Sequence, residues 1–180
     1  MPRWRWSLVE FERLGELGVF GEHEHIELIG GELVPMAAKG VRHETLRGQF
    51  LNWLMRRVPQ DVQLFSEPGW RPGADNYLEP DFLLAPQSTL APSVPPDQVL
   101  LLIEVAHSSL NFDTKIKSVV YATLGVREYW VVNAVTLETQ ILTQPSSVGF
   151  GQSTKVAADA VIVPAFVPAL ALRLADLGLD

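Results

Sequence analysis

The sequence contains no cysteine, an excess of acid over base and no long apolar run. The absence of cysteine excludes disulfides, thiolate nucleophiles and cysteine-ligated zinc sites, and it fits a reducing compartment such as the cytoplasm. No apolar stretch approaches the roughly 20 residues that a membrane span needs. Residues 1–7 alternate Arg and Trp, which is unlike the apolar segment of a secretory signal. We therefore predict a cytoplasmic protein with no membrane partner.

Basic residues are scarce: 14 Lys and Arg stand against 21 Asp and Glu, which gives a net charge of −7 and a pI near 5.1. Such a charge disfavours a protein that holds nucleic acid by bulk electrostatics. The arginines around one predicted helix either form a local basic patch or are ordinary solvated helix charges. They are Arg42, Arg47, Arg56 and Arg57, which Arg3 and Arg5 could join.

Length and pattern predict one domain over residues 1–180 with an α/β (α+β) fold, in which helices flank a central mixed sheet. Ser7 and Glu10 form a capping-box pattern before the first helix. Further helices are predicted at 42–58 and 113–124 from apolar spacing. The predicted strands are 26–29, 32–35, 62–66, 77–85, 99–106, 128–133 and 136–143, with short strands near Lys155 and Val161.

The Gly30-Gly31 pair predicts a two-residue hairpin turn between the first two strands. In that register Ile29 lies opposite Glu32, so Glu27 and Glu32 share one face of the hairpin. Two carboxylates therefore point to the same side of this small sheet.

Glu104 interrupts the apolar run 99–105, where an unpaired buried carboxylate would cost several kcal/mol. Such a group needs a partner or a metal, or its pKa rises; the alternative is a glutamate at a strand end that reaches solvent. Asp81 begins the preceding strand after Pro80, where a turn role is the ordinary alternative. Because neighbouring strands lie about 4.8 Å apart, Asp81 and Glu104 at matching heights could share one metal ion. With four histidines and no cysteine, the ion would be one that oxygen ligands suit, such as Mg²⁺, Mn²⁺ or Ca²⁺.

Lys117 lies on the helix that follows the Glu104 strand. If Ile116, Val119, Val120 and Leu124 form the centre of its buried face, Lys117 and Asp113 lie on the flank and Lys115 points to solvent. Lys117 can then bring its ammonium to the carboxylates. The alternative is a surface Asp113–Lys117 ion pair worth a few tenths of a kcal/mol.

These residues resemble the Uma2 (DUF820) family, a group within the PD-(D/E)XK restriction-endonuclease-like superfamily. The matching segments are HIELIGGELVPM, His43, EPDFLLA and LLLIEVAHSSLNFDTKIKSVVYATLGVREYWVVN, and the resemblance extends over residues 7–175. The last segment is the most specific, since Asp113, Lys117, Tyr121, Gly125-Val126 and 128–130 fall at family spacing.

The resemblance implies a restriction-endonuclease-like core and a metal-dependent endonuclease that hydrolyses DNA phosphodiester bonds. Asp81 and Glu104 would bind Mg²⁺ or Mn²⁺, and Lys117 would orient or help deprotonate a water. Glu27 or Glu32 would add a ligand or position the lysine. His43 would contact a phosphate or the metal's surroundings, or else have a capping or surface role.

The chain departs from the superfamily pattern at two places. Ala106 replaces the usual lysine two residues after the acid, so Lys117 would supply that charge from the following helix. Ala106-His107-Ser108 also replaces the polar residue that often follows the acid, which alters the entrance of the site.

The sequence is compatible with two other functions. A non-catalytic protein that binds a metal or a partner on the same scaffold is one, and a hydrolase of small phosphate esters, which suits the acidic surface, is another. Trp130 is predicted in the core, whereas Trp4, Trp6 and Trp70 are candidates for an interface with DNA or with a second copy in a homodimer.

Overall fold

The computed structural model describes residues 4–21 and 25–178. Its centre is a six-stranded sheet in the order β3-β4-β5-β6-β7-β8, in which β5 and β6 are parallel and every other neighbouring pair is antiparallel. The strands are β3 (Val62–Ser66), β4 (Phe82–Pro86), β5 (Leu101–Ala106), β6 (Glu128–Asn133), β7 (Thr139–Ser146) and β8 (Gly149–Val156). This mixed sheet and its helices confirm the predicted α+β class.

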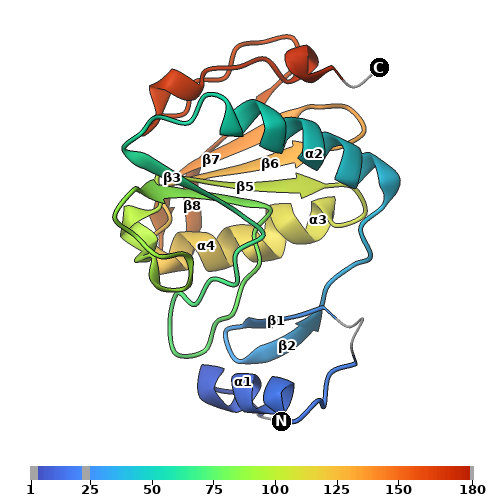
Figure 1. Cartoon of the computed structure of the whole chain (residues 1–180), viewed down its shortest axis with the longest axis vertical. Helices are drawn as coiled ribbons and strands as arrows, with labels where there is room; N and C mark the ends of the chain where they lie inside the picture. Colours follow the sequence, from blue (N-terminus) through green and yellow to red (C-terminus); the bar gives the residue numbers. More distant parts are fainter. Residues whose placement is uncertain (1–3, 22–24, 179–180) are drawn as a thin grey trace.

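Helices cover both faces of the sheet (Figure 1). On one face lies α2 (Val41–Met55), whose Leu46, Phe50 and Leu54 are buried. On the other lies a continuous helical segment made of α3 (Leu110–Phe112), a π-helical turn η3 (Asp113–Lys117) and α4 (Ser118–Leu124). This segment is the crossover that the parallel β5–β6 pair requires.

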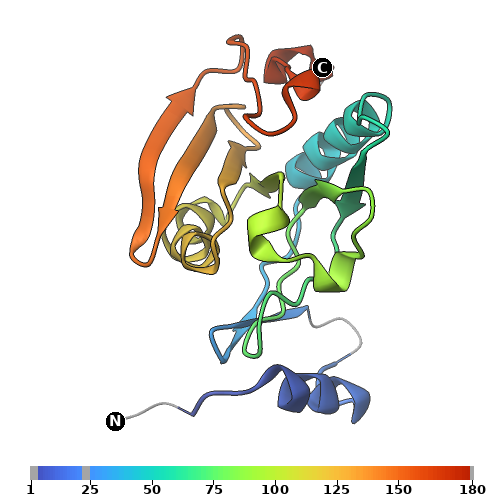
Figure 2. The same ribbon diagram turned by 90° about the vertical axis from the view of Figure 1, so that its left-hand side faces the viewer.

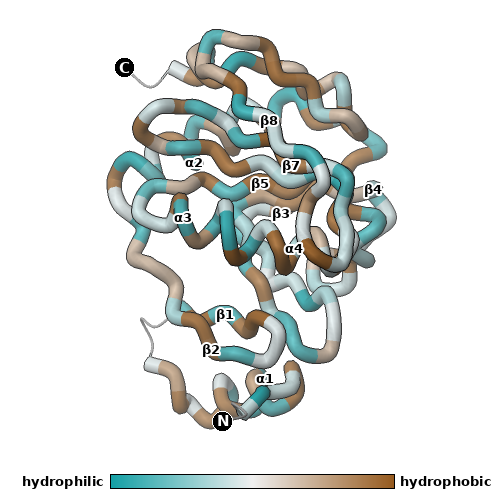
Figure 3. The backbone as a smooth tube through the Cα atoms, turned by 180° about the vertical axis from the view of Figure 1, so that it is seen from behind, coloured by the Kyte–Doolittle hydropathy of each residue, from teal (hydrophilic) through white to brown (hydrophobic). Residues whose placement is uncertain are grey.

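Strand β5 is buried on both faces, which explains its uninterrupted apolar sequence. Leu101, Ile103 and Val105 pack in the core on the α2 side, and Leu102 and Ala106 pack in the core on the α4 side. Since successive side chains of a strand alternate between faces, Glu104 points to the α4 side. Figure 3 shows hydrophobic stretches along the central strands and alternating hydropathy along α4.

The hairpin of β1 (Ile26–Ile29) and β2 (Glu32–Pro35) is a separate two-stranded sheet with the predicted register, including Ile29 opposite Glu32. A backbone bridge between Leu28 and Tyr77 ties it to the segment before β4. Helix α1 (Leu8–Glu16) packs beyond it, at the end of the long axis opposite the C-terminal segment (Figure 2). Ser7 and Glu10 make the predicted capping box.

The C-terminal segment covers the α2 side of the sheet with two short turns, η4 (Pro168–Leu170) and η5 (Leu174–Leu177). Buried Glu128 anchors it: Trp130 Nε1 donates to Glu128 Oε1 and the Ala165 amide donates to Oε2, both at 2.8 Å. Trp130 is in the core, as predicted. A bridge from Ile162 to Leu172 replaces the strand predicted near Val161.

Several predictions about local structure are wrong. Trp70 is fully buried, with its Nε1 donating to the Val94 carbonyl, whereas Trp4 is exposed as predicted. The strand predicted at 77–85 forms only from Phe82, since Tyr77 and Leu78 make isolated bridges instead. Ile116 and Val119 are exposed, so the buried face of their helix is not the predicted one.

Within the described part of the chain, no helix is both long and apolar enough to cross a bilayer.

Candidate active site

Asp81 and Glu104 meet at the end of the β4–β5 pair. Because Phe82 pairs with Ile103 in this antiparallel ladder, Asp81 lies one step further on, opposite Glu104. The Asp81 amide donates to Glu104 Oε2 at 3.4 Å, and the Val105 amide donates to Asp81 Oδ2 at 2.7 Å. The two residues are only 4% and 5% exposed. The predicted meeting of these carboxylates at matching heights is confirmed.

Lys117 joins this pair from the helical segment on the same side of the sheet. Its Nζ donates to Glu104 Oε1 and to Glu27 Oε1, each at 3.0 Å. Lys117 is 5% exposed, so it lies on the buried face of its helix and not on the predicted flank. Asp113 is buried too, which rules out the alternative of a surface ion pair, while Lys115 is exposed as predicted.

Glu27 and not Glu32 reaches this cluster. Glu27 Oε1 accepts from both Lys117 and the Glu79 amide, the latter at 2.8 Å. Glu32 lies beside the hairpin turn with its side chain 38% exposed and 3.3 Å from Arg5. It does not line the pocket that holds the other carboxylates. Sharing a face of the hairpin therefore does not bring both glutamates to the cluster, because Glu32 lies at the turn end of that face, away from the large sheet.

Tyr121 and His43 hold the two carboxylates from opposite ends. Tyr121 donates from its hydroxyl to Glu104 Oε1 at 2.8 Å, one helical turn beyond Lys117. His43 Nε2 lies 3.3 Å from Asp81 Oδ2, and its Nδ1 lies 3.2 Å from Glu44 Oε1. His43 is buried on α2, whose N-cap is Gly40, so the capping and surface alternatives for it are wrong.

Lys39 was not singled out from the sequence, yet it lies at this site. Its Nζ is 4.0 Å from Asp81 Oδ1, and it also forms an ion pair with Glu67. It sits in an irregular segment before α2, where no periodic pattern could have indicated its position.

The cluster is strongly acidic for a buried environment. Glu27, Asp81, Glu104 and Asp113 are all buried around one buried ammonium, that of Lys117. Burial raises the pKa of Glu104 to about 8 against the opposing effect of Lys117, and burial raises the pKa of Asp113 to about 6. Burial alone would lower the pKa of Lys117, but the carboxylates of Glu104, Glu27 and Asp113 outweigh it and raise this pKa. Lys117 is therefore an ammonium, and the surplus of acid favours an additional cation.

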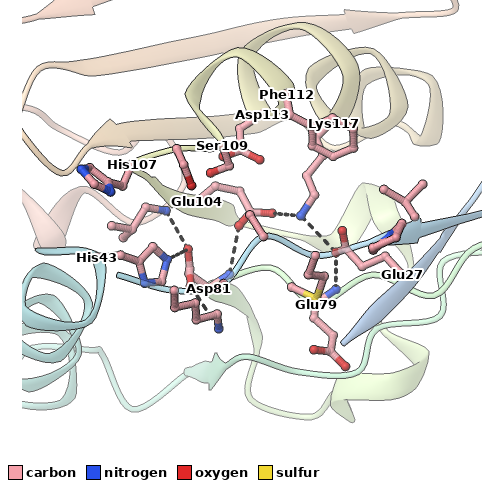
Figure 4. A pocket seen from close by; sticks show the side chains of 18 residues that line it. Glu27, His43, Glu79, Asp81, Glu104, His107, Ser109, Phe112, Asp113 and Lys117 are labelled. Atoms are coloured by element: carbon pink, nitrogen blue, oxygen red, sulfur yellow. Dashed lines mark hydrogen bonds and ion pairs between the residues drawn. The ribbon is translucent and has the colours of Figure 1, made fainter. Parts of the chain in front are cut away.

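These side chains line a pocket of about 220 Å³ between the β1–β2 hairpin, the start of α2 and the α3–η3 turn (Figure 4). Of the four carboxylate oxygens of Asp81 and Glu104, Asp81 Oδ1 and Glu104 Oε2 have the longest contacts with the protein. Asp81 Oδ1 lies 4.0 Å from Lys39 Nζ, and Glu104 Oε2 accepts from the Asp81 amide at 3.4 Å. Across residues 4–21 and 25–178, no group of three or more His, Asp or Glu side chains is arranged to hold a metal ion. A pair of carboxylates nevertheless fits Mg²⁺, which commonly binds one or two carboxylates and keeps its other positions for water and phosphate oxygen.

Of the two alternatives for the arginines around α2, a local basic patch or ordinary helix charges, the ion pairs of Arg47 favour the second. Arg47 pairs with Glu44 at 3.1 Å and with Glu67 at 3.0 Å, and Arg57 stacks over Trp53. Arg5 lies at the hairpin, where it pairs with Glu32 and donates to the Gly30 carbonyl. Arg3 lies outside the described residues. The ordinary alternative of helix charges accounts for Arg47 better than a nucleic-acid surface does.

The mixed sheet and its acidic pocket define a protein with a nuclease-like α+β fold. A solved structure described as "a putative nuclease belonging to DUF820 from Anabaena variabilis ATCC 29413" is similar, with a TM-score of 0.75 and 20% identity over 95% of this chain and 96% of that chain. The family model of Uma2, described as "Putative restriction endonuclease", matches residues 8–175, so the chain belongs to the Uma2 family. No curated protein matches the sequence.

Proposed function

We propose that this protein is a metal-dependent endonuclease that hydrolyses DNA phosphodiester bonds. The observation that carries the proposal is the buried Asp81–Glu104 pair on neighbouring strands, with Lys117 Nζ 3.0 Å from Glu104. Burying this many carboxylates together is costly without a compensating charge, which favours a functional role for the cluster over a structural one.

Asp81 and Glu104 would hold Mg²⁺ or Mn²⁺. When bound, such an ion polarises a phosphoryl oxygen and lowers the pKa of a water. The protein presents the two carboxylates already in place, since Asp81 is held by the Val105 amide and His43, and Glu104 by Lys117 and Tyr121.

Lys117 offsets the negative charge that develops on the phosphoryl group and orients the attacking water. It does not accept the proton of that water, because its pKa is raised by the surrounding carboxylates. Glu27 is a positioning residue: its Oε1 accepts from Lys117 and directs the ammonium towards Glu104.

DNA is the proposed partner, and its binding must overcome the net charge of −7. One small site cuts one strand, so we also propose a homodimer. A cytoplasmic location stays a prediction from the absence of cysteine.

The test is cleavage of plasmid and single-stranded DNA with Mg²⁺ or Mn²⁺, beside Asp81→Ala, Glu104→Ala and Lys117→Ala. Glu138→Ala is the matched control, because Glu138 forms an exposed ion pair with Lys155 and does not line this pocket. We expect cleavage that requires metal, persists in the control and disappears in the three site variants.

Cleavage of a small chromogenic phosphodiester without cleavage of DNA would instead favour a small-ester hydrolase. A folded protein that cuts neither substrate would contradict the proposal and favour a binding protein on this scaffold.

A further inference from the structure

His107 directly follows β5, three residues after Glu104, and lines the same pocket. It is exposed, and no hydrogen bond or ion pair to it is found among the residues that the structure describes. An imidazole is the side chain that most readily exchanges a proton between pH 5 and 8. A histidine with no partner at the rim of an acidic pocket is therefore placed to act on something that enters the pocket.

The contacts of the site put His107 and Lys117 at opposite ends of the carboxylate pair. Lys117 touches Glu104, whereas His43 touches Asp81. His107 lies against the start of the helix that carries His43, because its Nδ1 is 3.6 Å from where a Cβ on Gly40 would stand. Figure 4 shows the two histidines on one side of Asp81 and Glu104, and Lys117 and Glu27 on the other.

This arrangement matches the geometry of phosphodiester hydrolysis. The attacking and leaving oxygens lie roughly in line on opposite sides of the phosphorus. If the water is oriented on the Lys117 side, the leaving oxygen departs on the histidine side. That oxygen is a poor leaving group as an alkoxide. A proton delivered to it in the transition state typically raises the rate by about 10²- to 10⁴-fold.

Two other basic side chains on the histidine side of the pocket, those of His43 and Lys39, are less suited to donate that proton. His43 is buried and has both ring nitrogens within hydrogen-bond reach of carboxylates, those of Asp81 and Glu44. Lys39 is ion-paired with Glu67, and an ammonium gives up its proton less readily than an imidazolium near neutral pH. The other titratable side chains that line this pocket are Lys39 and His43 from the α2 side, Asp81 and Glu104 from the sheet, Asp113 and Lys117 from the helical segment, Glu27 from the hairpin and Glu79 from the segment before β4.

We propose that His107 is the general acid that protonates the leaving oxygen, an inference that rests on the proposed nuclease function. The water oxygen forms the new bond to phosphorus and releases its proton to solvent. The bond between phosphorus and the leaving oxygen breaks, and its electron pair takes the proton from the His107 imidazolium. The products are an alcohol and a phosphomonoester, and His107 regains a proton from solvent.

The test compares His107→Gln with wild type on two substrates, DNA and bis(p-nitrophenyl) phosphate. Glutamine still forms hydrogen bonds but delivers no proton, and the nitrophenolate leaves without one. We expect kcat on DNA to fall about 10²- to 10³-fold and kcat on the nitrophenyl ester to change less than about threefold. If wild type cuts DNA alone, an oligonucleotide with sulfur at the mapped leaving position replaces the ester.

The matched control is His25→Gln, which removes another exposed histidine that does not line this pocket and should leave both rates unchanged. Equal losses on both substrates, or no loss on DNA, would overturn the role of His107 while leaving the nuclease proposal intact. A wild-type protein that cuts no substrate would overturn the nuclease proposal itself.

Discussion

Replacing Glu104 with glutamine should make the metal-free protein more stable while abolishing its response to metal. Glu104 is buried in a cluster whose other acidic members are Glu27, Asp81 and Asp113. Burial raises its pKa from the ordinary value of 4.5 to about 8. The folded protein therefore holds this proton more tightly than the unfolded chain does, and the free energy of unfolding falls as the pH rises from 4.5 towards 8.

The size of the effect follows from that difference. Each pH unit between the two pKa values costs about 1.4 kcal/mol, so the penalty at pH 7 is roughly 3 kcal/mol. A glutamine removes this penalty, but its NH₂ group cannot accept from the Asp81 amide as Glu104 Oε2 does. We therefore expect a net gain of about 1–3 kcal/mol at pH 7, and about none near pH 4.5.

The assay is urea unfolding in EDTA at both pH values, with Glu138→Gln as an exposed control that should stay within about 0.5 kcal/mol of wild type. Mg²⁺ at about 100 times its Kd should then add about 2.7 kcal/mol to wild type and nothing to Glu104→Gln. A Glu104→Gln protein that is less stable than wild type in EDTA at pH 7 would contradict this prediction, since it would mean that the carboxylate is ionised and well compensated without metal.

Three further predictions concern stability and assembly. Ser7→Ala removes the hydroxyl of the α1 capping box and should lower the free energy of unfolding by about 1 kcal/mol in a urea titration; an unchanged midpoint would mean that α1 contributes nothing to global stability. Phe50→Ala empties a fully buried position where α2 meets Phe82 and should cost about 3–5 kcal/mol, so a loss below about 1 kcal/mol would contradict the packing of α2 on the sheet. Sedimentation should give twice the 20.0 kDa mass of the chain, whereas a monomer mass would contradict the proposed dimer.

Much of the fold was predictable because local signals agreed with tertiary structure. The Gly30-Gly31 turn determined the hairpin register, and Ser7 with Glu10 determined the start of α1. The apolar run of β5 indicated a strand buried on both faces. By contrast, Trp70 was expected at the surface but is buried. Its burial could not be predicted, because the burial of a residue in a loop depends on contacts that are distant in sequence, such as the one to Val94.

The part of the site that lies on the strands was predictable, because a charged residue within an apolar strand stands out in the sequence. Glu104 was recognised as a carboxylate inside an apolar run, and Asp81 as its neighbour on the next strand. The helix face was wrong because the most apolar stripe, with Ile116 and Val119, is partly exposed, and the buried face instead carries Lys117 and Tyr121 to the carboxylates. Polar residues at a functional site thus break the hydrophobic pattern from which helix faces are inferred.

The choice between Glu27 and Glu32 could not be made from the hairpin alone. Both lie on the same face, but only the position of the hairpin against the large sheet brings Glu27 to Lys117. That position depends on the bridge from Leu28 to Tyr77, which no local pattern indicates.

A crystal structure of the protein grown with Mn²⁺ and examined for anomalous scattering would show directly whether Asp81 and Glu104 bind a metal ion. We expect one strong peak within bonding distance of both Asp81 and Glu104, with Lys117 beside Glu104 and not bonded to the ion. A fully occupied Mn²⁺ elsewhere in the protein, with no peak at these two carboxylates, would contradict this expectation.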